Sequence, residues 1–408
     1  MISYEYPPNE GVGGLRAYYF SKYLERSGWN VTVVTLNDNS QRNTAIWEDM
    51  FNGISEVYHS EEALSLRKFA SRFKFFIPDV NIGWILPTFR LCDRIVRKKN
   101  IKVIYASCNP FSSAVIGVLI KKRFNIPLIV DFRDPWTLDW DVVYPTYFHE
   151  FLDNFLESRV LRYADHLVVA TEYIKKEYIK KYSFIQDKIS VITNGFEAND
   201  FQSQHLPLFE KFTITYCGSF SGRQPDLFLS GLKKAIMRKR LSPKTFQALF
   251  LGPKDKQLTQ LIKHLDLSQY AIHIGYFQHK IAVEFMFRSH MLLLIEPRQG
   301  ALTTKVFEYL ATGKPILALV SKGELEELVR KYSDVSYVLT LRDPDEVAEA
   351  IYDCYNKWLH NGYRLTNSEK VKAFRKTYNR QALTEKLIVI LDHLIPQKCE
   401  SLNEAPYL

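Results

Sequence analysis

The sequence has 408 residues, of which 46% are hydrophobic and 24% charged, and its formal net charge is +9. This length and composition are typical of a globular protein with about two to three domains and large apolar cores. No run of about 18 apolar residues occurs, so we expect no transmembrane helix, and the first eight residues lack the features of a signal peptide. Five scattered cysteines without a CxxC pair argue against a disulfide framework or a zinc site and indicate a reducing, cytoplasmic compartment.

In the first half of the chain, short apolar segments predict strands at 31–35, 103–107, 128–132, 166–171 and 189–193. Helical periodicity between them predicts helices at 15–27, 85–98, 112–124, 149–162 and 172–181. Continuous apolar strands separated by helices are typical of a parallel sheet covered on both faces. Residues 2–5 are short for a first central strand, so we expect strand residues to precede Met1.

The second half repeats this alternation after a polar stretch at 197–211. Its predicted strands are 213–218, 247–252, 272–276, 291–296, 316–320 and 337–341. Its predicted helices are 226–238, 257–264, 281–289, 304–312, 324–332 and 345–358. We therefore expect an α/β fold with two Rossmann-like, doubly wound parallel-sheet domains at 1–200 and 211–375, facing each other across a cleft. A last helix at 379–395 either closes the second domain or crosses back to the first.

Ligands of open parallel sheets bind beyond the carboxyl ends of the strands, so the segments that follow strands are the candidate sites. The first is the glycine-rich segment 11–16, with Gly13 and Gly14, which precedes a helix. Glycines let the backbone approach a ligand, and a helix N-terminus offers N–H groups to an anion. The segment is not GxGxxG, so dinucleotide binding has little support, and a plain flexible turn is the alternative.

A basic region with interleaved aromatic residues follows at 63–100. Its nine basic residues are Arg67, Lys68, Arg72, Lys74, Arg90, Arg94, Arg97, Lys98 and Lys99, against the two acids Asp79 and Asp93. Its aromatic residues are Phe69, Phe73, Phe75, Phe76, Trp84 and Phe89. Such a surface attracts nucleic acid or an anionic membrane. A solvated helix face is the alternative.

The segment 131–136 places Asp131, Arg133 and Asp134 directly after a predicted strand. Three charged residues before a proline do not suit a buried core. They are suited to orienting sugar hydroxyls or to acid–base chemistry. A charged network that merely holds the loop is the alternative.

Two segments of the second half have the residues of an anion site. Gly218 and Arg223 lie in a Gly/Ser-rich loop after a strand, and an arginine can hold a diphosphate with its planar fork. Thr304, Lys305 and Glu308 share one face of the first turn of a helix that follows another strand. A carboxylate in this position can accept both hydroxyls of a ribose. A surface ion pair between Lys305 and Glu308 is the alternative.

The string from Lys305 to Pro315 resembles the donor-binding segment of family 4 retaining glycosyltransferases, which have the GT-B fold. The resemblance extends over most of the chain. It is carried by 4–16, by 78–79 with 83–84, by 109–112 and 131–136, and by 194–196 at the end of the first domain. The segments between 78 and 136 resemble those of a bacterial branch that assembles surface polysaccharides.

The resemblance implies a nucleotide-diphosphate sugar donor held mainly by the second domain, with no metal ion and no cofactor besides this substrate. Glu308 would bind the ribose and Arg223 the diphosphate, approached by Gly13 and Gly14 from the first domain. Residues on the acceptor side of the first domain would be Asn109, Asp131, Arg133 and Asp134. The reaction would retain the anomeric configuration, and the acceptor would be a lipid-linked glycan at the cytoplasmic leaflet, where the region 63–100 would contact the anionic membrane.

Three departures from the family pattern affect the donor site. The family's E-x7-E pair lacks its first glutamate, because Gly300 stands eight residues before Glu308. We expect the backbone amides of Gly300, Ala301, Leu302 and Thr303 to replace that contact. The positions of a common lysine after the arginine hold Phe228 and Leu229, so Lys305 is expected to supply the second positive charge. Where many members have a histidine, this chain has Arg133 and Asp134.

The expected mechanism stabilises the leaving diphosphate by Arg223, Lys305 and helix N-terminal amides. Front-face substitution, in which the leaving phosphate helps deprotonate the acceptor, is favoured over a glycosyl-enzyme intermediate, and Asp134 would orient the acceptor or the sugar. Two alternatives stay open: a UDP-sugar epimerase of the same architecture, and a non-catalytic subunit that binds nucleotide sugars. No recognised module supports nucleic-acid binding.

Overall fold

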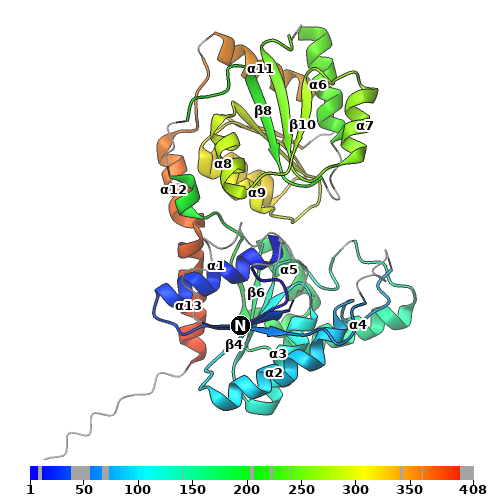
Figure 1. Cartoon of the computed structure of the whole chain (residues 1–408), viewed down its shortest axis with the longest axis vertical. Helices are drawn as coiled ribbons and strands as arrows, with labels where there is room; N and C mark the ends of the chain where they lie inside the picture. The colour runs from blue at the N-terminus through cyan, green and yellow to red at the C-terminus, as the bar shows by residue number, and fades with distance from the viewer. Residues whose placement is uncertain are drawn as a thin grey trace, which may run out of the picture. The chain divides into compact units, whose positions relative to one another are not determined.

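The computed structural model describes residues 1–7, 12–37, 56–66, 73–139, 141–202, 206–220, 223, 225–239, 241–340, 343–360 and 362–395. The chain forms two compact units, each a sheet with helices on both faces (Figure 1). The N-terminal unit comprises Met1–Ile192 together with Leu383–Leu408, and the C-terminal unit comprises Thr193–Ala382. Within the described ranges, no helix is both long enough and apolar enough to cross a membrane.

The N-terminal unit is built on a seven-stranded parallel sheet with the order β3-β2-β1-β4-β5-β6-β7. Its strands are β1 (Ile2–Ser3), β2 (Thr32–Leu36), β3 (Glu56–Ser60), β4 (Ile104–Cys108), β5 (Leu128–Phe132), β6 (His166–Val169) and β7 (Ile189–Val191). Its helices are α1 (Val12–Arg26), α2 (Ile85–Lys98), α3 (Ser112–Phe124), α4 (Tyr147–Tyr163), α5 (Glu172–Lys181) and most of α13 (Arg380–Leu394). Successive residues of β5 pack on opposite faces: Val130 lies in the core with α2 to α5, and Ile129 in the core with α1 and α13.

The C-terminal unit is built on a six-stranded parallel sheet with the order β10-β9-β8-β11-β12-β13. Its strands are β8 (Phe212–Cys217), β9 (Phe246–Leu251), β10 (Ala271–Gly275), β11 (Met291–Glu296), β12 (Ile316–Val320) and β13 (Tyr337–Leu339). Its helices are α6 (Asp226–Lys239), α7 (Lys256–His264), α8 (His279–Arg288), α9 (Thr304–Thr312), α10 (Glu324–Tyr332), α11 (Pro344–Leu359) and α12 (Ser368–Tyr378). The neighbouring strands β8 and β11 bring two predicted site segments to one edge of the sheet.

The structure confirms two Rossmann-like parallel sheets. It adds β3 and α12, which the sequence patterns did not predict. Among the residues that the structure describes, β3 pairs only with β2 at the sheet edge, and it is half-exposed, so its sequence is mixed and lacks a continuous apolar run. α13 returns to the N-terminal unit, where Leu383, Leu387 and Leu391 join the core beside α1.

Candidate functional site

Lys305 lies at the carboxyl edge of the second sheet, in the first turn of α9. Its Nζ donates to the Tyr216 hydroxyl at 2.8 Å and lies 4.3 Å from the centre of that ring. The backbone carbonyl of Ser219 is 3.5 Å away. Burial, reinforced by repulsion from Arg223, lowers the pKa of Lys305 to about 7. Its amine therefore titrates near neutral pH, at the end of β8.

Gly218 is required for this placement of Lys305. Its φ is +118°, which L side chains rarely adopt. A Cβ atom at Gly218 would also stand 2.5 Å from Lys305 Cε. The glycine thus lets the lysine chain cross directly over the end of β8.

Arg223 is held by Glu296, the last residue of β11. The Arg223 guanidinium contacts Glu296 Oε2 at 2.6 Å and donates from Nε to the Ile295 carbonyl at 3.1 Å. Arg298 donates to the other oxygen, Oε1, at 2.9 Å. Glu296 is fully buried; although burial alone would raise its pKa, the bonds from Arg298 and Arg223 lower it. No sequence pattern predicted a role for Glu296 and Arg298. The charged residue Glu296 at the end of an apolar strand is the signal that could have indicated this ion pair.

Glu308 is one turn further along α9, and its partner is a histidine. His279 Nε2 lies 2.9 Å from Glu308 Oε1, and its Nδ1 lies 3.4 Å from Asp200 of the 3₁₀ helix Ala198–Phe201. Burial lowers the pKa of His279, but the carboxylates of Glu308 and Asp200 outweigh this and raise it to about 10. The alternative of a Lys305–Glu308 ion pair is therefore wrong, because each side chain has another partner.

We expect the His279 contact to stabilise the folded protein in a pH-dependent way. Because the folded pKa is raised, the stabilisation is complete below the ordinary value of 6.5 and is lost as the pH rises through about 10. The free energy of unfolding of His279→Gln should therefore differ most from wild type near pH 6 and converge with it above about pH 10. Urea denaturation across this range measures the difference. In an Asp200→Asn/Glu308→Gln background the NMR titration of His279 should move back toward its ordinary value, and an unchanged titration would contradict the assignment.

The residues expected to replace the missing glutamate form the loop between β11 and α9. Gly300 has a φ of +75°, and Thr303 is the residue before the first turn of α9, which begins at Thr304. The Leu302 carbonyl accepts from Asn194 Nδ2 at 3.5 Å, and Ala301 lies between these positions. The loop therefore ends at the N-terminus of α9, beside Lys305.

In the N-terminal unit, Asp131 is part of the core. Arg16 of α1 donates to both of its oxygens, at 2.6 Å from Nε and 3.0 Å from the terminal nitrogen. Tyr105 donates a further short hydrogen bond to Asp131, and Arg16 also donates to the Ile192 carbonyl at 2.7 Å. Asp131 is fully buried, so it offers no oxygen to an acceptor. The prediction of an acceptor-side role for Asp131 is therefore corrected, because the Arg16–Asp131 pair fixes α1 to the sheet.

The other predicted residues of this unit lie closer to its surface. Arg133 Nε lies 3.2 Å from the exposed carboxylate of Asp134. A Cβ at Gly13 would overlap the Glu5 carboxylate and stand 2.7 Å from the Arg133 guanidinium, so Gly13, Glu5 and Arg133 meet at the start of α1. A Cβ at Gly14 would come within 3.0 Å of the backbone of Glu5 and Tyr6, a tight approach that also favours glycine.

Asn109 is exposed at the end of β4. The Arg133 amide donates to the Cys108 carbonyl at 3.2 Å, which sets Asn109 next to Arg133. The predicted residues Gly13, Asn109, Arg133 and Asp134 therefore share one edge of the sheet. Glu5 joins them there, although the sequence patterns did not single it out.

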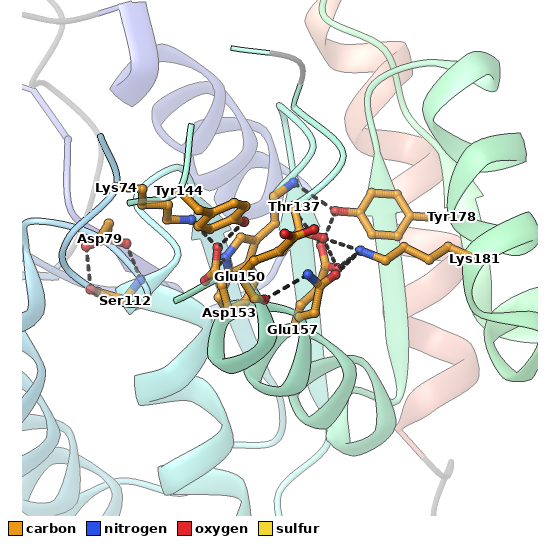
Figure 2. Close-up of polar contacts among 12 residues, drawn as sticks. Lys74, Asp79, Ser112, Thr137, Tyr144, Glu150, Asp153, Glu157, Tyr178 and Lys181 are labelled. Carbon is orange, nitrogen blue, oxygen red and sulfur yellow. Dashed lines mark hydrogen bonds and ion pairs between the residues drawn. The ribbon is translucent and has the colours of Figure 1, made fainter. Parts of the chain in front are cut away.

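The loop that carries Arg133 and Asp134 is anchored on α4 by two buried carboxylates (Figure 2). Asp153 accepts from Trp136 Nε1 at 2.8 Å, and Glu157 accepts from the Thr137 amide at 3.1 Å. The Tyr178 hydroxyl accepts from the Trp136 amide and donates to Glu157. These bonds fix the loop on both sides of Trp136, and no sequence pattern had indicated the two acids of α4.

Only part of the basic region 63–100 lies on the protein surface. Trp84 is fully buried and Phe89 packs against the core, while Lys74 is bound to Asp153 at 2.6 Å. Arg67, Lys68, Phe69 and Arg72 lie outside the described residues. The exposed basic residues are on α2: Arg90, Arg94, Arg97 and Lys98. The prediction that basic and aromatic side chains share the surface of this segment is thus wrong for Trp84 and Phe89, whose rings pack in the core.

Comparison with known proteins adds a family match and a fold. Residues 13–200 match the model of Glycosyltransferase Family 4. Anabaena HepE in complex with UDP and glucose is similar in structure, with a TM-score of 0.70 and 14% identity over 96% of this chain and 98% of that one. The sucrose-phosphate synthase of Thermosynechococcus elongatus has a TM-score of 0.71 and 14% identity, over 96% and 98% of the two chains.

The lipopolysaccharide outer core galactosyltransferase WaaB, in its apo form, has a TM-score of 0.61 and 13% identity over 95% of this chain and 97% of that one. No curated protein matches by sequence. At these identities the solved structures show a shared fold. The family match extends over residues 13–200, and the fold of the chain is the GT-B fold of these glycosyltransferases.

Proposed function

We propose that the chain transfers a sugar from a nucleotide-diphosphate sugar to a lipid-linked glycan, with retention of configuration, during assembly of a surface polysaccharide. The observation that carries this proposal is the group of Arg223, Lys305 and the N-terminus of α9 at one sheet edge, with Glu308 one turn further. Two cations and a helix N-terminus suit a diphosphate, and the carboxylate suits a ribose. HepE, crystallised with UDP and glucose, supports a UDP-sugar as the donor.

In the proposed reaction the bond between the anomeric carbon and the diphosphate oxygen breaks, and a bond to the acceptor oxygen forms on the same face. The acceptor proton passes to the leaving diphosphate, so no carboxylate nucleophile, metal ion or further cofactor is needed. Arg223 and Lys305 stabilise the charge that develops on the leaving oxygen, and Glu296 holds Arg223 in place. Donor binding exchanges the His279 partner of Glu308 for the ribose hydroxyls. Asp134 orients the acceptor.

The acceptor proposal places the protein at the inner face of the cytoplasmic membrane. Arg90, Arg94, Arg97 and Lys98 are exposed on α2 and would attract anionic headgroups. By its name, WaaB is a galactosyltransferase of the outer core of lipopolysaccharide. This similarity supports a membrane-bound glycan as the acceptor.

Donor binding can be tested by thermal denaturation with UDP, UDP-glucose and other nucleotide sugars. A ligand at 100 times its Kd should add about 2.7 kcal/mol to the free energy of unfolding. We expect Glu308→Ala to abolish this stabilisation, because it removes the proposed ribose contact. Glu369→Gln, an exposed acid on α12 of the same unit, is the control and should bind as wild type. Equal stabilisation of wild type and Glu308→Ala would contradict the assignment.

Transfer itself is tested with a nucleotide sugar and membrane-extracted glycolipid acceptors. The proposal requires release of the nucleoside diphosphate only when acceptor is present, and NMR of the product should show the anomeric configuration of the donor. Conversion of the donor without acceptor would favour the epimerase alternative, and binding without turnover would favour a non-catalytic subunit. Loss of activity in EDTA would contradict metal independence.

A further inference from the structure

Part of helix α4 of the N-terminal unit has its polar and apolar faces reversed, although Leu156, Val160 and Leu161 also pack into the core. Its inward face holds Asp153 and Glu157, both fully buried, and its outward face holds aromatic rings. The exposed fractions are 91% for Tyr147, 64% for Phe148, 64% for Phe151 and 53% for Phe155. A surface helix normally turns its apolar stripe to the core and its charges to water. The reversal means that α4 has an outward face unsuited to water.

The orientation of α4 is fixed by the buried acids. Asp153 accepts from Lys74 Nζ at 2.6 Å and from the Tyr144 hydroxyl at 2.7 Å, in addition to Trp136 (Figure 2). Glu157 accepts from Lys181 Nζ at 3.0 Å and from the Tyr182 hydroxyl at 2.8 Å. Rotating α4 to bury its rings would leave these donors and carboxylates without partners, which is strongly unfavourable for buried charged groups. The exposure of the rings is therefore built into the unit.

A second segment extends the exposed aromatic surface. The Lys74 amide donates to the Val143 carbonyl at 2.8 Å, which holds residues 73–75 beside the segment that leads into α4. Phe73 and Phe75 are about half-exposed, and the Phe75 ring centre lies 6.3 Å from that of His149. We use the term aromatic ribbon for these six residues: Phe73, Phe75, Tyr147, Phe148, Phe151 and Phe155. Exposed rings gathered in this way, instead of scattered singly over the surface, are typical of an interaction site.

The charges at the end of the ribbon are positive. Arg159 continues the four-residue spacing of Tyr147, Phe151 and Phe155, and its guanidinium lies 5.6 Å from the centre of the Phe155 ring. One turn further, Arg162 lies 4.3 Å from the ring of Phe184, which is itself partly exposed. An exposed acid, Glu150, lies within the helix. α3 packs against both α4 and α2, so the basic residues of α2 belong to the same helical layer.

The ribbon lies at the same sheet edge as the acceptor-side residues. α4 follows β5, so its first turns, which carry Tyr147 to Phe151, are at the carboxyl ends of the strands. Lys74 Nζ, between Phe73 and Phe75 in sequence, lies 5.7 Å from the Phe111 ring and 5.9 Å from the Trp136 ring. Phe111 and Trp136 in turn follow Asn109 and Asp134 by two residues each.

We infer that the aromatic ribbon is a docking surface for a lipid bilayer that contains anionic headgroups. The rings would enter the boundary between headgroups and acyl chains, as aromatic residues do in interfacial helices, while Arg159 and Arg162 would bind lipid phosphates. This contact would hold Asn109, Arg133 and Asp134 at the membrane surface, where a lipid-linked acceptor presents its glycan. Only this last consequence rests on the proposed function.

Vesicle flotation tests the inference with the full-length protein and liposomes of equimolar phosphatidylglycerol and phosphatidylcholine. We expect wild type to float and Phe151→Gln/Phe155→Gln to bind about tenfold or more weakly, because two partly inserted rings are lost. Phe151→Trp/Phe155→Trp should bind as wild type. Val389→Gln, which removes an exposed apolar side chain from α13 of the same unit, is the matched control and should also float. An unchanged melting temperature shows that the variants are folded.

Each other outcome overturns the inference. Failure of wild type to float, or equal flotation of the glutamine double variant, would show that the ribbon does not insert. A concentration-dependent dimer in sedimentation that is abolished by the glutamine variant, without vesicle binding, would identify the ribbon as a contact between two copies. The nucleotide-induced thermal shift is a separate measurement, so failure of vesicle binding leaves the proposed donor site to be judged by itself.

Discussion

Replacing Lys305 by alanine should lower kcat roughly 100- to 1000-fold, with Arg223 still in place. The ammonium is the second positive charge of the proposed diphosphate site, and its partners, the hydroxyl and ring of Tyr216 and the carbonyl of Ser219, are uncharged. Steady-state kinetics with the donor identified by thermal denaturation measures the effect. If Lys305→Ala kept near-normal kcat, the role of this residue in stabilising the leaving group would be wrong.

The pH dependence provides an independent readout of the same residue. Because burial and Arg223 lower the pKa of Lys305 to about 7, the free protein has the ammonium below that pH and loses it above. We expect kcat/KM to fall as the pH rises through about 7, since this parameter reports the free enzyme. In Lys305→Arg the guanidinium stays charged over this pH range. The fall of kcat/KM through about pH 7 should therefore disappear, however much activity the variant retains. A descending limb of the same midpoint in both proteins would assign it to another group.

Replacing Asp131 by asparagine should destabilise the N-terminal unit by about 3–5 kcal/mol, because it leaves the buried Arg16 guanidinium without its counter-charge. Trp84 and Trp136 are fully buried in this unit, so their fluorescence during urea denaturation reports the change. Asp134→Asn, three residues away and exposed, should alter the free energy of unfolding by less than about 0.5 kcal/mol.

The double variant Arg16→Met/Asp131→Leu separates the two explanations for Asp131. If the residue is structural, the double variant should be less destabilised than the sum of the single changes, because no unpaired charge remains. Additive effects together with full stability of Asp131→Asn would return Asp131 to the acceptor side.

Apart from β3 and α12, the sequence was sufficient to predict the two parallel sheets and the places where polar residues follow strands, because both depend on local periodicity and on turn residues. It was insufficient for the partners of those residues. Asp131 and Asp134 are three positions apart and look equivalent in sequence, yet one faces α1 in the core and the other faces solvent. The difference depends on Arg16, which is 115 positions earlier in the chain.

The same limit explains the residues that the sequence patterns missed. Glu296 gains its role from Arg223, 73 positions away, and Glu308 is paired with His279 on another helix. Asp153 and Glu157 have the spacing of an ordinary solvated helix face, and only the packing of α4 on Trp136, Tyr144 and Lys181 shows that they point inward. Helical periodicity shows that one face of a helix is polar. It does not show that polar residues of this face point into the core, as Asp153 and Glu157 do in α4.

The return of α13 to the N-terminal unit has a consequence for synthesis of the protein on the ribosome. Leu383, Leu387 and Leu391 complete the core that α1 shares with β2 and β5, yet they follow the entire C-terminal unit in sequence. This face of the first sheet, which α1 covers in part, therefore lacks the three leucines while all of Thr193–Ala382 is made. All residues of the C-terminal unit are therefore synthesised before the N-terminal unit is complete. The usual N-terminal-first order of folding is inverted for this chain.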